Sequence, residues 1–179
     1  LRKSFALKKL PSPTSVDEWH KRKCRKVLEI IETDEIKKKI TGEFTYGVAA
    51  KLINCYLKAR FVCGGSHRNK TVKQLHPPID SVLLKKLRQE SKSGLNKKSK
   101  MNLGGFLCGK FLKDLKAFGE EAKGRPPGWV AKHSRTPAWS KFNGRQYRMI
   151  IKRIRYCFGN ECNKKFWKIE KYWDPERES

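Results

Sequence analysis

Apolar residues recur along this chain at the spacing of α-helices, and no stretch alternates apolar and polar residues long enough to form a β-strand. The clearest pattern lies in 145–158, where the apolar residues stand three or four positions apart: Tyr147, Ile150, Ile151, Ile154 and Phe158. Similar spacing predicts further helices over 15–33, 46–63, 81–88, 105–118 and 164–173. The sequence therefore predicts an all-α fold.

The length of 179 residues is that of one ordinary domain, so we expect a single all-α domain over 1–179. Gly64-Gly65 should end the helix over 46–63, and His76-Pro77-Pro78 closes a polar stretch that cannot continue a helix. The segment 89–104 contains many Lys, Ser and Gly residues. It is expected to form a basic linker or loop between two helical lobes.

The net charge indicates the class of partner. The chain has 43 Lys and Arg residues against 17 Asp and Glu residues, which gives a formal charge of +26 and a pI near 10.1. This excess is far larger than solubility requires, and it predicts binding to a polyanion. With 5 Trp, 5 Tyr and 9 Phe residues, the chain has too many large side chains to be a disordered basic tail.

The sequence shows no pattern typical of a membrane span or a signal peptide. No apolar run approaches the ~18–20 residues of a membrane span, and the basic segment Leu1–Lys9 is not followed by the apolar core of a signal peptide. We expect a soluble monomer in the cytoplasm, associated with the nucleoid if the source is bacterial.

The 6 cysteines lack close pairs, the nearest being Cys157 and Cys162, so reduced thiols are expected. No cofactor is expected. A zinc site is the alternative.

A lysine in the helix over 46–63 is the first candidate functional residue. On a wheel of ~100° per residue, one broad apolar face is formed by Val48, Leu52, Cys55, Tyr56 and Ala59, and Ala49 and Ile53 widen it. Lys51, Asn54 and Lys58 form a narrow polar stripe beside it. If most of this helix is buried, desolvation favours the neutral amine of Lys51, which can attack a sugar C1′ and hold it as a Schiff base.

Such a lysine needs a carboxylate nearby, and Asp80 is the candidate. It follows Pro77-Pro78-Ile79 at the start of a predicted helix, where the helix N-terminus stabilises the ionised form. Asp80 could accept a proton from Lys51 or stabilise a cationic sugar. The alternatives are that Lys51 is a surface lysine with a partly buried stem and that Asp80 is an ordinary helix N-cap.

Two segments carry a family resemblance: the run Tyr46-Gly47-Val48-Ala49-Ala50-Lys51-Leu52-Ile53-Asn54 and, 29 positions after the lysine, Pro78-Ile79-Asp80. Together they resemble the helix-hairpin-helix DNA glycosylases, particularly the archaeal 8-oxoguanine DNA glycosylase branch. The resemblance covers about residues 42–88, and Ala49 stands where the family has the second glycine of its hairpin. It implies a DNA glycosylase, with β-lyase activity, whose Schiff-base lysine is Lys51 and whose catalytic aspartate is Asp80.

The implied partner is duplex DNA that contains a damaged or modified base. The residues expected to contact DNA are Gly47, Asn54, Lys58, Arg60, His76, Lys97, Lys98 and Lys100. The irregular Gly- and Pro-rich segment supplies aromatic residues that could stack on a flipped base or wedge into the duplex: Trp129, His133, Trp139 and Phe142. Trp19, Trp167 and Trp173 follow helical spacing and are expected to pack in the core.

Two other functions remain open at the level of sequence. A non-enzymatic nucleic-acid-binding protein would need only the charge and the helices, with Lys51 and Asp80 as an ion pair. A metal-independent ribonuclease similar to HEPN domains is also possible, because Arg60 and His67 fit the loose Arg-x4–6-His pattern of those enzymes. Trapping of an imine on DNA would distinguish the glycosylase from both alternatives.

Overall fold

A computed structural model describes residues 6–38, 40, 42–96, 113, 139–158 and 165–172. Every regular element in these ranges is a helix, and none of them contains a β-strand. The all-α prediction is therefore confirmed for the part of the chain that is described. Of the helix predicted over 105–118, only residue 113 is described, and it is helical.

Helix α1 spans Val16–Ile31, close to the predicted start and two residues short of the predicted end. Ser15 occupies the N-cap position, but its side chain makes no capping hydrogen bond. Its hydroxyl instead lies 2.9 Å from the hydroxyl of Ser12. Asp17 and Glu18 in the first turn place negative charge at the positive end of the helix dipole. A short helix α2, Asp34–Lys37, follows.

Helix α3 spans Tyr46–Leu57 and contains Lys51. Its N-cap is Thr45, whose hydroxyl accepts a hydrogen bond from the backbone N–H of Val48 at 3.3 Å. The chain continues without a break as a π-helical segment, Lys58–Ser66. Gly65 has a φ of 83° within this segment, and this left-handed conformation ends the helical path as the Gly64-Gly65 pair predicted.

Helix α4 spans Ser81–Asn96, twice the length predicted from the sequence, because residues 89–96 continue the helix instead of forming a linker. Gln, Glu and Lys are good helix formers, and the Lys86–Glu90 ion pair at 3.6 Å joins successive turns. Near the C-terminus, the predicted α-helix over 164–173 is a 3-10 helix, Phe166–Tyr172. This short helix packs against α4.

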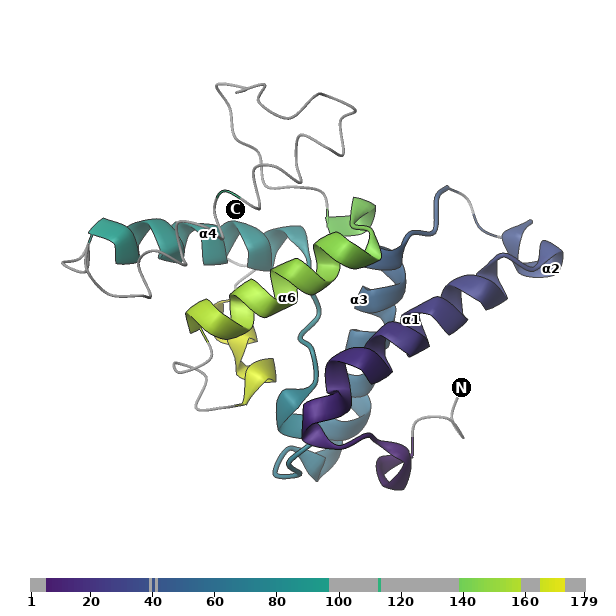
Figure 1. Ribbon diagram of the computed structural model, residues 1–179, viewed down its shortest axis with the longest axis horizontal. Coiled ribbons are helices and arrows are strands. Elements are labelled where there is room, and N and C mark those ends of the chain that lie inside the picture. The colour runs from purple at the N-terminus through teal and green to yellow at the C-terminus, as the bar shows by residue number, and fades with distance from the viewer. Residues whose placement is uncertain are drawn as a thin grey trace.

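The core forms where α3 packs against α1 and against α6, which spans Gly144–Phe158 (Figure 1). Short 3-10 helices at Leu7–Lys9, Pro13–Ser15, Val72–Gln74 and Trp139–Lys141 connect these elements. The largest fully buried side chains are Tyr147, Phe142, Leu57, Leu83, Leu84, Leu87, Ile150, Ile151, Ile154 and Ile169. Trp19 is buried as predicted, Trp167 is partly buried, and Trp173 lies outside the described residues. No helix in the described ranges has the length and apolar character that a membrane span requires.

The 139–142 segment is held tightly against the N-terminus of α3. The N–H of Gly47 donates to the carbonyl of Phe142 at 3.0 Å, and the hydroxyl of Thr45 donates to the carbonyl of Ser140. A Cβ atom at Gly47 would lie 2.1 Å from the carbonyl oxygen of Trp139. Only glycine at this position allows the backbone of the 3-10 helix to approach α3 so closely.

We therefore expect Gly47→Ala to destabilise the protein by about 1–3 kcal/mol, the usual cost of overpacking a close contact. Urea unfolding followed by circular dichroism would measure the change. Leu52→Ala on the same helix is the matched control. That side chain is 54% exposed, so its removal should cost less than about 1 kcal/mol. Equal stability of Gly47→Ala and wild type would contradict the close approach.

Candidate active site

One face of α3 and of its π-helical continuation borders an open cleft of about 320 Å³. The helical side lines the cleft at intervals of about one turn, and the opposite side comes from the segment before α4 and from the C-terminal 3-10 helix. The lining residues are Lys51, Cys55, Lys58, Ala59, Cys63, Pro78, Asp80 and Glu170. Chain segments far apart in sequence thus bring two lysines and two carboxylates to one site.

Lys51 and Asp80, the two predicted catalytic residues, meet in this cleft. The Nζ atom of Lys51 lies 3.5 Å from Oδ2 of Asp80, and their side chains are 31% and 15% exposed. The other carboxylate oxygen, Oδ1, accepts a hydrogen bond from the N–H of Leu83 at 2.9 Å. Asp80 therefore caps α4 through Oδ1 and pairs with Lys51 through Oδ2.

Trp139 lies beside the amine. The Lys51 Nζ is 4.4 Å from the centre of the Trp139 ring, a distance at which the ring face stabilises the positive charge. Trp139 is partly buried and belongs to the 3-10 helix Trp139–Lys141, which packs closely against α3 at Gly47. An aromatic plane therefore borders the lysine in the described structure.

The apolar face expected on the wheel is only partly the face that is buried, because Ala49 and Ile53 at its edge are in the core and its centre is not. The core side of α3 is formed by Ala49, Ala50, Ile53, Asn54 and Leu57, whereas Leu52, Cys55 and Ala59 are exposed. Small residues on the core side allow close packing against α1, which the wheel by itself does not reveal. Lys51 consequently lies at the edge of an open cleft instead of within a buried stripe.

A second ion pair, between Lys58 and Glu170, lies in the same cleft. The Glu170 side chain is 16% exposed, and burial raises the pKa of its carboxyl while the hydrogen bond from Lys58 opposes that rise. Glu170 matches no sequence motif and was not among the predicted site residues. Its one signal is an acid within an otherwise basic segment, next to the buried Ile169.

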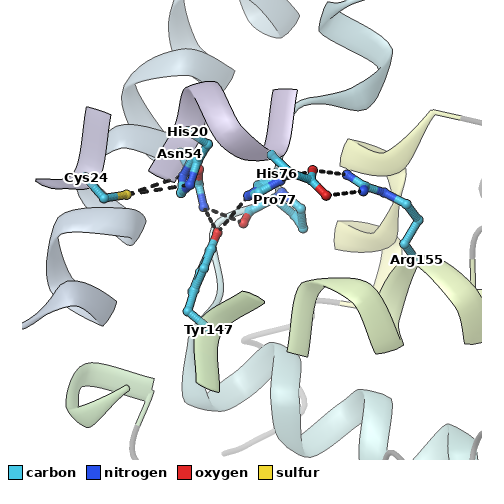
Figure 2. Close-up of polar contacts among 8 residues, drawn as sticks. His20, Cys24, Asn54, His76, Pro77, Tyr147 and Arg155 are labelled. Atoms are coloured by element: carbon cyan, nitrogen blue, oxygen red, sulfur yellow. Dashed lines mark hydrogen bonds and ion pairs between the residues drawn. The ribbon is translucent and has the colours of Figure 1, made fainter. Parts of the chain in front are cut away.

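A chain of buried polar side chains crosses the core behind the cleft (Figure 2). His20 Nε2 lies 2.8 Å from Asn54 Oδ1, and Asn54 Nδ2 donates to the carbonyl of Pro77 at 2.9 Å and to the Tyr147 hydroxyl at 2.8 Å. The Tyr147 hydroxyl lies 3.2 Å from Nδ1 of His76. Because an amide oxygen can only accept, His20 must donate through Nε2.

At one end of this network of polar side chains lies the ion pair between Asp17 and Arg155. His76 Nε2 lies 2.9 Å from Oδ1 of Asp17, and Arg155 donates to both Asp17 oxygens at 2.9 and 3.0 Å. The hydrogen bond from His76 and the guanidinium of Arg155 hold the pKa of Asp17 well below its usual value. Because the carboxylate only accepts, His76 donates to it through Nε2. Burial disfavours the charged form of both histidines, and a neutral His76 accepts from the Tyr147 hydroxyl through Nδ1.

Acid should destabilise the protein through these histidines. Burial lowers the pKa of both His20 and His76 below the ordinary value of 6.5. The unfolded chain therefore binds protons that the folded protein does not, and stability is lost as the pH falls below 6.5. The maximum loss is about 1.4 kcal/mol per pH unit for each histidine.

Urea unfolding at about pH 7.5, 6.5 and 5.5 would measure this loss. His67→Gln is the control, because His67 is partly exposed and lies outside the network. This variant should show the same pH dependence as wild type. Stability that stays constant or rises between pH 6.5 and 5.5 would contradict the neutral state of the two histidines.

The remaining predicted residues are distributed between the core and the surface. Asn54 and His76, expected to contact DNA, are 0% and 4% exposed and belong to the buried network. Gly47 and Phe142 are also buried, so neither reaches the surface. Arg60 is exposed outside the cleft lining. The other candidates lie outside the described residues: Lys97, Lys98, Lys100, Trp129 and His133.

Comparison with protein-family models, with curated proteins and with solved structures gives no match for this chain. Among the residues that the structure describes, no group of three or more His, Cys, Asp or Glu side chains could hold a metal ion. Function is therefore inferred from the geometry of the cleft and from the charge of the chain.

Proposed function

We propose that this protein is a DNA glycosylase with β-lyase activity, which flips a damaged or modified base out of duplex DNA and excises it. The observation that carries the proposal is the Lys51–Asp80 pair, with 3.5 Å between Nζ and Oδ2, in an open cleft. A cleft of about 320 Å³ is within the range of small-ligand sites. The finer fold assignment, a glycosylase-like domain with a hairpin-like element leading into α3, belongs to the same proposal.

In the proposed reaction, Asp80 takes a proton from the Lys51 ammonium and so generates a neutral amine. The amine attacks C1′ of the flipped nucleotide, and the bond between C1′ and the base breaks with its electron pair on the departing base. The nitrogen gives one proton to the departing base. The C1′–O4′ bond then breaks with its electron pair on O4′, which takes the proton held by Asp80, and a protonated Schiff base forms between Lys51 and C1′. Trp139 lies at the amine and is positioned to shield the cationic intermediate. This chemistry requires neither a metal nor a redox cofactor.

Exposed basic side chains on neighbouring helices support binding of the DNA backbone. Arg145, Arg148 and Lys152 follow one another at helical spacing on the exposed side of α6. Arg25 is exposed on α1. Burial raises the pKa of Tyr46 at the start of α3, and the nearby charges of Arg148 and Arg25 oppose that rise. Positive charge from both helices thus lies near the helix that bears Lys51, where it can attract phosphates.

The experiment that tests the proposal is borohydride trapping. Duplex oligonucleotides that each contain one damaged or modified base, and one with an abasic site, are incubated with the full chain and reduced. The glycosylase proposal predicts a covalent complex that peptide mapping locates at Lys51. Binding without trapping would support the non-enzymatic alternative. Cleavage of RNA in EDTA, without trapping on DNA, would support the ribonuclease alternative with Arg60 and His67.

A further inference from the structure

The cleft contains a second lysine–carboxylate pair that the proposed glycosylase reaction does not use. Lys58 stands seven positions after Lys51, which corresponds to about two helical turns, or roughly 10 Å along the axis. Its ammonium pairs with Glu170 from the C-terminal 3-10 helix. Both pairs line the same cleft, so a sugar bound to Lys51 would have a second carboxylate within the site.

The two oxygens of Glu170 are in different environments. Oε2 accepts a hydrogen bond from Lys58, which fixes the carboxylate in place. Oε1 is buried and accepts no hydrogen bond from any described residue. A buried carboxylate oxygen without a donor disfavours the ionised form of Glu170. Burial also raises the pKa of the carboxyl, which makes it a stronger base than an exposed glutamate.

Cys55 lies between Lys51 and Lys58 on the cleft side of the helix. Burial raises the pKa of the Cys55 thiol, and the charges of Lys51, Glu170, Lys58 and Asp80 all act on it. Glu170 therefore borders the same cleft as the Lys51–Asp80 pair.

We propose that Glu170 is the base that removes the C2′ proton in the lyase step. This inference rests on the proposed glycosylase function. Once Lys51 is joined to C1′ as an iminium ion, the Glu170 carboxylate takes the C2′ proton, and the electron pair of that bond forms a C1′–C2′ double bond as the nitrogen becomes neutral. The nitrogen lone pair then re-forms the C1′–nitrogen double bond, the electron pair of the C1′–C2′ double bond moves to C2′–C3′, and the C3′–O bond breaks with its electron pair on the departing phosphate. Water finally hydrolyses the iminium ion and releases Lys51.

Asp80 is less suited to this step. Its Oδ2 faces the Lys51 nitrogen, and its Oδ1 accepts a hydrogen bond from the N–H of Leu83. Both oxygens therefore already have a partner. The C2′ atom lies one bond beyond the carbon that the nitrogen attacks. Glu170 is the other carboxylate that lines the cleft, and among the described residues only Lys58 is hydrogen-bonded to it.

The test separates the two chemical steps on a duplex that contains an abasic site. The Glu170→Gln variant keeps the shape of the side chain and can still bond to Lys58. It should form the Schiff base at the wild-type rate, measured by borohydride trapping, while strand cleavage slows about 100-fold. Glu170→Asp should restore part of the cleavage, because a carboxylate is again present. Glu32→Gln, which removes the exposed partner of Lys37, should trap and cleave like wild type.

The outcomes distinguish the two proposals. If wild type gives no trapped complex, the glycosylase function itself is wrong. If wild type traps and cleaves, and a folded Glu170→Gln variant cleaves at the wild-type rate, the role of Glu170 is wrong while the glycosylase proposal stands. If the glutamine variant does not fold, as judged by circular dichroism, the folded Glu170→Asp variant decides: a reduced ratio of cleavage to trapping supports the role, and an unchanged ratio refutes it.

Discussion

Replacing Lys51 with glutamine should abolish borohydride trapping and slow base excision by at least ~10³-fold, because Lys51 supplies the amine that bonds to C1′ in the proposed mechanism. DNA affinity should stay within about tenfold of wild type, since the chain has 43 Lys and Arg residues and loses the charge of one. The fold should tolerate the change. The Lys51 side chain is 31% exposed, and loss of such an ion pair costs about 1 kcal/mol or less.

The matched control for this experiment is Lys26→Gln. Lys26 is exposed on α1 and does not line the cleft, so its substitution removes the same charge without touching the site. It should excise and trap like wild type and show a similar small loss of affinity. Full excision by a folded Lys51→Gln variant would show that Lys51 is not the nucleophile. Equal loss of activity in both variants would instead indicate that charge alone limits the reaction.

Replacing Asp80 with asparagine should slow excision by at least ~100-fold with almost no change in stability. The structure explains why these effects separate. Oδ1 caps α4 through the N–H of Leu83, and asparagine caps a helix about as well as aspartate. Oδ2 faces the Lys51 amine, and the amide cannot accept its proton. Acid–base groups of this kind contribute about 10²–10⁴-fold to the rate.

Asp80→Ala serves as the comparison that isolates the cap. It removes both the charge and the capping oxygen, so its unfolding free energy should fall by about 1 kcal/mol relative to Asp80→Asn, while both variants excise equally slowly. Single-turnover excision and thermal unfolding of the three proteins would measure these quantities. A stable Asp80→Asn protein with the wild-type excision rate would reduce Asp80 to a structural cap.

The site depends on the buried network as well as on its own residues. Asn54 stands one turn after Lys51 on α3, and its amide holds the carbonyl of Pro77, three residues before Asp80. Tyr147 of α6 accepts a hydrogen bond from the same amide group. The hydrogen bond from Asn54 to Pro77 thus holds the segment that carries Asp80 against the helix that carries Lys51, although neither catalytic residue takes part in it. We infer that Asn54 is a positioning residue rather than a DNA contact.

The sequence pattern predicted much of the local structure. Helical spacing located α1, α3 and α6 to within a few residues, because each has a face that must be buried. It underestimated α4, whose continuation to Asn96 has too few apolar residues to show a period. The pairing of Lys51 with Asp80 was expected from the glycosylase resemblance, and the cleft brings their side chains together. Their catalytic roles stay predictions.

Glu170 and the histidine network could not be predicted in the same way. Glu170 reaches the cleft because the C-terminal 3-10 helix packs near α4, a contact between segments far apart in the chain. His20 and Tyr147 follow the helical spacing of ordinary core residues. Their polar atoms find partners only when three helices and the segment around Pro77 meet.

The sequence by itself determined the helical class, the positions of the main helices, the strong positive charge and the candidate pair Lys51 and Asp80, because periodicity, charge and short motifs are local properties of a chain. Tertiary structure alone decided which face of α3 is buried, which residues share the cleft, and that Asn54 and His76 are internal. The physical reason is that burial and ion pairing depend on what packs against a residue. Two faces of one helix can be equally apolar on a wheel, and only the neighbouring helices select between them.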